Sequence, residues 1–174
     1  MTEPVKRYSV PARFLHWIVA AFVFVAWPAG AIIKFVKEDV KLTFYMVHES
    51  LGFLILWLML ARLVVRLFVK PPPHLPMPAL QRGVADTVHW SLYAALIIQP
   101  ILGFLATNAW GFPFSLFGQW PIWSPIGKEP GIAPLLSSAH LVLGWTILVL
   151  FVAHFGGVLY HHVIRRDETL ERML

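Results

Sequence analysis

The sequence predicts an all-α integral membrane protein, a four-helix bundle with both termini in the cytoplasm. Of the 174 residues, 58% are hydrophobic and only 13% are charged, and the mean hydropathy is +0.69. Soluble domains are about half apolar and about a quarter charged, so a bilayer accommodates this apolar excess better than a globular core. The apolar runs are continuous and do not alternate as barrel strands do, which favours helices.

Four apolar segments are long enough to cross the roughly 30 Å of hydrocarbon, which takes about 20 helical residues. We expect these helices at residues 14–33, 44–68, 84–106 and 137–164, within a single domain spanning 1–174. The first segment follows basic residues, as the core of a signal peptide would. Its apolar run is longer than such a core usually is, so we expect it to remain a transmembrane helix.

The three connections between these helices differ in character. Residues 34–43 are predicted to form a short polar loop. Residues 70–82 are rich in proline and cannot be helical throughout. Residues 107–134 form the longest connection, whose three tryptophans suit an element lying among the lipid headgroups.

The basic residues predict the orientation. Ten of the 14 lysines and arginines lie at the N-terminus, the second connection, the C-terminus and the helix ends beside them. By the positive-inside rule that side is cytoplasmic, and the protein is expected to be a multi-pass protein of the bacterial inner membrane. These residues form short flanks and not a stripe, so nucleic acid is not an expected partner.

Eight histidines stand in this apolar chain. Ionisable groups inside a membrane are costly and are candidates for function. His140 and His154 are 14 residues apart on the last helix, which brings them to within about 40° of one face and separates them by about 21 Å along the axis. One helix face therefore carries a histidine near each membrane surface, which indicates two separate sites.

The predicted topology provides each of these histidines with a partner at its own depth. His48 begins the second helix on the outer side, beside His140, and His16 begins the first helix on the inner side, beside His154. No carboxylate accompanies either pair. Zinc prefers four N, S or O ligands, whereas two axial imidazoles suit haem iron because the porphyrin supplies the other four. With no cysteine in the chain to attach haem covalently, the sequence predicts two non-covalent b-type haems.

Glycines accompany the outer pair. Gly52 and Gly144 each follow a candidate ligand by four residues, so each lies on the same helix face as that ligand. A glycine there leaves room for a flat macrocycle. The alternative is close packing between helices through small residues, which is common in membranes.

The two halves of the chain resemble each other in a way that favours a parallel repeat. The pair His16-Trp17 opens the first helix as His89-Trp90 opens the third, and the His-x-x-x-Gly pattern recurs on the second and fourth helices. The second half is thus a candidate for a diverged copy of the first.

Three further residues are expected on the cytoplasmic side. Arg62 stands 14 residues after His48, where the repeat has His154, so a His89–Arg62 pair cannot ligate iron. Arg62 is a candidate partner of a haem propionate or a quinone, with snorkelling to the surface as the alternative. His161 lies two turns after His154 on nearly the same face, and His89 and His161 are candidate quinone-site residues or simply interfacial ones.

Several motifs resemble those of the bacterial cytochrome b561 family of small di-haem membrane cytochromes, and the resemblance covers essentially the whole chain. The motifs are Arg13-Phe14-Leu15-His16-Trp17, His48-x-x-x-Gly52, Ala61-Arg62-Leu63-x-x-Arg66, and the ending from His154 through His161-His162 to Asp167-Glu168-Thr169-Leu170-Glu171-Arg172-Met173. The resemblance implies haem b as cofactor and the same four histidines as ligands.

The resemblance implies two functions in electron transport. Some members oxidise superoxide at the periplasmic face and pass the electrons to ubiquinone, which would make this chain an oxidoreductase of the respiratory chain. Related cytochromes relay electrons for a partner dehydrogenase or another periplasmic redox protein. A proton-coupled transporter is a third class, but no helix is clearly broken at mid-membrane as its binding site would require.

Overall fold

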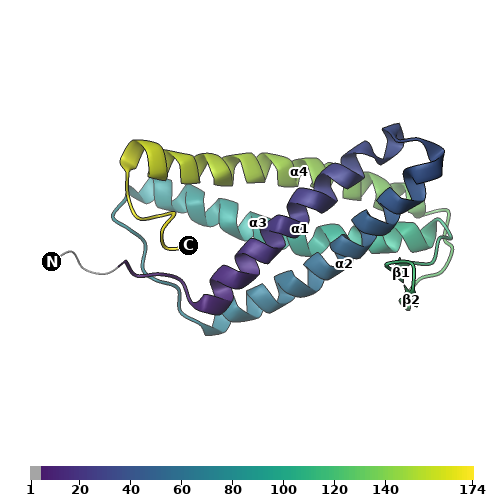
Figure 1. Ribbon diagram of the computed structural model, residues 1–174, viewed down its shortest axis with the longest axis horizontal. Coiled ribbons are helices and arrows are strands. Elements are labelled where there is room, and N and C mark those ends of the chain that lie inside the picture. Colours follow the sequence, from purple (N-terminus) through teal and green to yellow (C-terminus); the bar gives the residue numbers. More distant parts are fainter. Residues whose placement is uncertain (1–4) are drawn as a thin grey trace.

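The computed structural model describes residues 5–174, in which two of four long helices run lengthwise and the other two cross them obliquely (Figure 1). They are α1 (Val10–Ile32), α2 (Glu38–Phe68), α3 (Ala79–Ala109) and α4 (Ala133–Leu159). A 3₁₀ turn, η1 (Ile33–Phe35), extends α1, and a π-helical turn, η2 (Tyr160–Arg165), extends α4. Each long helix is apolar enough to cross a membrane, so the predicted all-α membrane bundle is confirmed.

The helices begin four to six residues earlier than predicted. Pro11 and Pro134 stand in the first turns of α1 and α4, where a missing backbone N–H costs nothing. Glu38 and Asp39 stand in the first turn of α2, where acidic side chains favour the positive end of the helix dipole. The expectation that residues 34–43 are a polar loop was therefore wrong from Glu38 onward.

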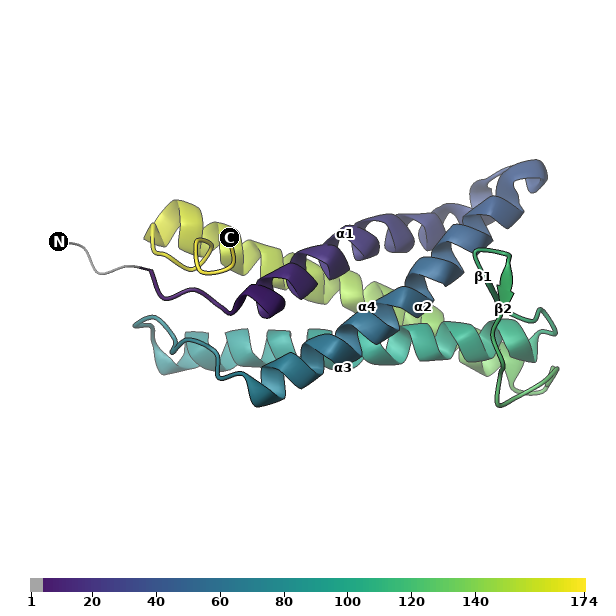
Figure 2. The same cartoon turned by 60° about the horizontal axis from the view of Figure 1, so that its bottom comes forward.

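The longest connection contains a small hairpin that the sequence did not predict. Strands β1 (Ser115–Leu116) and β2 (Trp120–Pro121) pair antiparallel, with positive φ at Phe117 and Gly118 in the turn between them. The backbone N–H of Phe117 donates to the buried Ser50 hydroxyl on α2 at 2.8 Å. The hairpin therefore lies against the end of the bundle where α1 turns into α2 (Figure 2).

The helices pack in the order α1 on α2, α2 on α3 and α3 on α4. Their small core is centred on Val19, Ala26, Ile55 and Met59. Only 6–17% of the most apolar stretch of each helix is buried inside the protein. The apolar side chains on the outside need a solvent other than water, which the bilayer provides.

Large side chains connect α1 to α4. The rings of Phe24 and Phe151 lie 5.4 Å apart, and those of Trp27 and Trp145 lie 5.5 Å apart. The indole N–H of Trp27 donates to the Gly144 carbonyl at 2.8 Å. These contacts hold α4 opposite α1 and α2, the two helices that carry His16 and His48.

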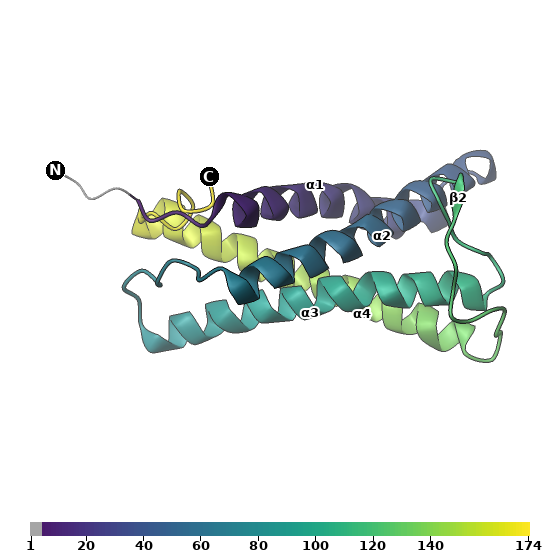
Figure 3. The same cartoon turned by 90° about the horizontal axis from the view of Figure 1, so that it is seen from below.

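The segment that precedes α1 from residue 5, the C-terminal segment and the α2–α3 connection meet at the end of the bundle opposite the hairpin (Figure 3). The backbone N–H of Tyr8 donates to the Arg172 carbonyl at 3.0 Å. The Arg172 side chain donates to the carbonyls of Lys6 and Pro73, at 3.0 and 2.7 Å. The three segments predicted to share one side of the membrane therefore lie at one end of the bundle; the cytoplasmic assignment of that end stays a prediction.

Candidate functional site

The outer pair of histidines lies inside the bundle near the hairpin. The ring centroids of His48 on α2 and His140 on α4 are 5.9 Å apart, with the ring planes at 90°. A metal–imidazole bond is about 2 Å long, so two rings that share one metal atom have centroids roughly 6 Å apart. The structure brings the two predicted partners to that separation.

The backbone determines which ring nitrogen of each outer histidine carries the proton. Nδ1 of His48 lies 2.7 Å from the Ala26 carbonyl oxygen, and Nδ1 of His140 lies 3.0 Å from that of Gln99. A carbonyl oxygen only accepts, so each Nδ1–H donates, and Nε2 of the neutral ring keeps its lone pair. Both rings therefore have the tautomer that a metal atom needs from a histidine ligand.

A mainly apolar cavity adjoins the outer pair, lined among others by Trp27, Gly52, Gln99 and His140. A Cβ at Gly52 would meet no atom within 4 Å; that this space takes a flat macrocycle stays a prediction. At Gly144 the corresponding space is taken by the Gln99 amide nitrogen, 3.2 Å from the position of a Cβ. The Gln99 side-chain oxygen is buried without a hydrogen-bond partner among the described residues, so this cavity can accept a further group.

The inner pair lies toward the end of the bundle where the termini meet. The ring centroids of His16 on α1 and His154 on α4 are 6.2 Å apart, with the planes at 70°. The ring of His89 on α3 lies 5.2 Å from that of His154, so a third imidazole stands at the same depth. Across residues 5–174 no group of three or more His, Cys, Asp or Glu side chains is placed so that all could bind one metal ion.

Arg62 points into the bundle and does not snorkel. Its Nη1 lies 2.7 Å from Nδ1 of His16, and its Nε donates to the Tyr93 hydroxyl at 3.0 Å. A guanidinium only donates, so Nδ1 of His16 accepts, and this ring has the opposite tautomer from the outer pair. For Nε2 of His16 to bind a metal, Arg62 must turn to another acceptor, and a haem propionate is a suitable one.

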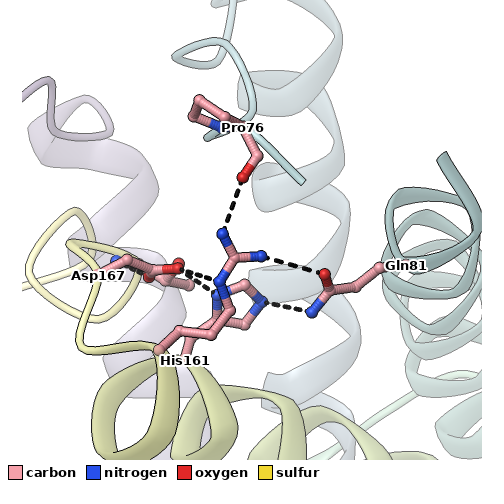
Figure 4. A network of polar contacts seen from close by, with 6 residues as sticks. Pro76, Gln81, His161 and Asp167 are labelled. Atoms are coloured by element: carbon pink, nitrogen blue, oxygen red, sulfur yellow. Dashed lines mark hydrogen bonds and ion pairs between the residues drawn. The ribbon is translucent and has the colours of Figure 1, made fainter. Parts of the chain in front are cut away.

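His161 belongs to a polar network at the base of α4 (Figure 4). The residue is 8% exposed, with Nδ1 of its ring 2.7 Å from the Asp167 carboxylate and Nε2 3.4 Å from the Gln81 amide nitrogen. Arg165 joins the network by donating to Gln81 at 3.2 Å and to the Pro76 carbonyl at 2.9 Å. Within the part of the chain that the structure describes, no polar contact or ring pair links His161 to the other candidate quinone residue on α3.

Asp167 is ionised in this network. Burial by itself would raise the pKa of its carboxyl, but hydrogen bonds from Thr169 and His161 outweigh that effect and hold the pKa below its usual value. The carboxylate fixes the His161 ring at the point where the chain leaves the membrane. The network thus connects the C-terminal segment to the start of α3.

Sequence reasoning missed the residues that support the outer rings. Ala26 and Gln99 accept from the imidazoles, and each stands ten residues after the histidine that opens its helix, His16 or His89. Aligning α1 with α3 on those histidines would have matched Ala26 with Gln99. Such an alignment shows that the two positions are equivalent, but only the packing of α2 and α4 shows that each carbonyl contacts an imidazole.

Four apolar helices with paired imidazoles in their interior define a class of protein, the small helical membrane cytochromes. The chain belongs to the prokaryotic cytochrome b561 family, whose sequence model matches residues 7–174. It is therefore a haem b-binding cytochrome of electron transport and a multi-pass protein of the bacterial inner membrane.

Curated relatives match almost end to end. The chain is 30% identical to cytochrome b561 homolog 2 of Escherichia coli K12, with 99% of this chain and 94% of that protein covered. It is also 30% identical to the probable superoxide oxidase CybB of Yersinia pestis, covering 97% and 96%. Cytochrome b561 homolog 1 of Escherichia coli K12 is 28% identical, with 97% of each chain covered.

Proposed function

We propose that the chain is a di-haem cytochrome that carries electrons across the inner membrane to a quinone. The observation that supports this proposal is the presence of two imidazole pairs at opposite ends of one bundle, each with rings about 6 Å apart. His48 and His140 would hold the outer haem, beside Gly52 and Gly144, and His16 and His154 the inner one. Bound haem supplies reversible one-electron chemistry. We also propose that residues 1–174 act as one domain, of which residues 1–4 lie outside the described part.

The stoichiometry tests this proposal most directly. We expect two haems per chain and removal of both by acid–acetone, because no cysteine is present to hold haem covalently. Haem is quantified from the absorption spectrum of the reduced pyridine complex against the protein concentration. One haem per chain, or haem that stays in the protein fraction, would refute the two-site assignment.

We propose superoxide as the electron donor and ubiquinone as the acceptor. The support is the 30% identity to a protein named a probable superoxide oxidase. The purified chain should reduce ubiquinone when superoxide is the only donor. Haem reduction that requires an added dehydrogenase or periplasmic redox protein would instead identify the chain as an electron-relay subunit.

We propose the quinone site on the inner side, formed by Arg62, His89 and His161. A quinone that accepts electrons needs positive charge and proton donors nearby, which arginine and histidine provide. The His89 ring lies beside His154, so a ligand in contact with His89 is close to the inner haem site. His161 would act from its network with Asp167, whose carboxylate orients the ring through the contact with Nδ1 at 2.7 Å.

Substitution of the two histidines tests this site. His89→Ala and His161→Ala should each lower the rate of quinone reduction about tenfold or more, since a positioned proton donor contributes at least that much. The rate is measured on protein whose two haems have been confirmed by spectrum. His162→Ala is the matched control, because His162 neighbours His161 but is exposed. Normal rates and normal inhibitor sensitivity in both variants would place the quinone elsewhere.

A further inference from the structure

We infer that Gly30 and Gly103 are positioning residues for the outer haem. Each glycine leaves free the space in which one of the two imidazole ligands lies, and we call this space a seat. A Cβ at Gly30 would lie 2.6 Å from Nδ1 of His48, and a Cβ at Gly103 would lie 2.8 Å from Cε1 of His140. Ordinary contacts of a Cβ begin near 3.4 Å. Only glycine therefore lets these rings lie where they do. The inference rests on the proposed role of His48 and His140 as ligands.

The rings cannot withdraw from these seats without losing their orientation. Each Nδ1–H donates to a carbonyl one helical turn before the glycine, Ala26 on α1 and Gln99 on α3. The glycine and the carbonyl of one helix thus hold the edge of a ring that comes from the neighbouring helix. A methyl group at the seat would lengthen the hydrogen bond and move Nε2 relative to the opposite ring.

The arrangement occurs twice, in equivalent positions of the two halves. Gly30 follows His16 by 14 residues, and Gly103 follows His89 by 14 residues. The seat on α1 receives a ring from α2, and the seat on α3 receives a ring from α4. Such a repetition of glycine, carbonyl and imidazole is not expected from incidental packing of one side chain.

Other helical glycines do not share this environment. A Cβ would meet nothing within 4 Å at Gly52, Gly83, Gly156 and Gly157. Small residues often serve close contact between helices in membranes, but at both seats the nearest atoms belong to an imidazole and not to a backbone. The two seats are therefore explained by the rings they hold.

Alanine at the seats tests the inference. In Gly30→Ala and Gly103→Ala the outer haem content should fall at least twofold, or the outer haem should keep its occupancy with a shifted midpoint potential and altered low-spin EPR signal. The ligand and its Nδ1–H bond are displaced, and such supporting contacts orient and tune a metal ligand. The inner haem should be unchanged and reports that the bundle has folded.

Gly83→Ala is the matched control, because Gly83 lies on α3 like Gly103 but a Cβ at this position would meet no atom within 4 Å. Alanine forms helices better than glycine. Haem loss that occurs in Gly30→Ala and Gly103→Ala but not in Gly83→Ala therefore cannot come from helix propensity. If the Gly30→Ala protein fails to accumulate, the Gly103→Ala protein decides the test, because a Cβ at Gly103 would overlap less with its imidazole ring than a Cβ at Gly30.

Two results would overturn the inference: a Gly103→Ala protein with the outer haem fully bound and unchanged in potential and EPR signal, or equal loss of both haems. The proposed function is judged separately from His140→Ala. If His140→Ala retains both haems, the ligand assignment itself has failed. If His140→Ala loses the outer haem while the seat variants behave like Gly83→Ala, only the present inference has failed.

Discussion

His140→Ala is expected to remove the outer haem and to leave the inner one, and His154→Ala to do the opposite. Both histidines stand on α4, but 14 residues separate them, which is about 21 Å along a helix. Each ring faces a different partner, His48 or His16, on a different helix. Deletion of one imidazole therefore affects one site only, and the total haem should fall from two per chain to one.

The two haems are distinguished by reduced-minus-oxidised spectra and by EPR of the low-spin ferric signals. His48→Ala should reproduce His140→Ala, and His16→Ala should reproduce His154→Ala, because each pair shares one iron. Cofactor loss can destabilise a protein that binds it, so each variant is also supplied with free imidazole, which should restore the missing spectrum in the space left by the side chain. The depth assignment is wrong if a variant loses only the haem of the opposite end.

Arg62→Met should lower the midpoint potential of the inner haem and leave that of the outer haem unchanged. Whether the guanidinium faces His16, 2.7 Å away, or turns to a haem propionate, Arg62 keeps a positive charge beside the inner site, and that charge favours the state that has gained an electron. Two unit charges 4 Å apart interact by about 4 kcal/mol at an effective dielectric constant of 20. Even a third of that energy corresponds to on the order of 60 mV for one electron.

The measurement is a spectroscopic redox titration of both haems. Arg66→Met is the matched control, because Arg66 stands one turn further along α2 with its guanidinium 5.9 Å from the Trp90 ring centroid. Methionine keeps much of the length of the side chain, so packing changes little. An equal fall in both variants would show that the general charge of this surface, and not the position of Arg62 beside the inner site, determines the potential.

The sequence by itself determined the class of fold and the pairing of the histidines. Long apolar runs specify helices that cross a bilayer, since lipid cannot satisfy an exposed backbone. The depth of a residue in such a helix follows from its position in the run, at a rise of about 1.5 Å per residue. His48 with His140 and His16 with His154 could therefore be matched by depth alone, and the structure brings each pair together.

Only the tertiary structure decided which groups support each ring. Helical periodicity specifies the face of a residue, but not the rotation and crossing of one helix against the next. It therefore did not show that His48 rests on Gly30, or that Arg62 turns inward to His16 and Tyr93. The same limit applies to His161, which faces Asp167 and Gln81 because the chain turns back after α4. Depth is a property of one helix, whereas contact depends on how two helices pack.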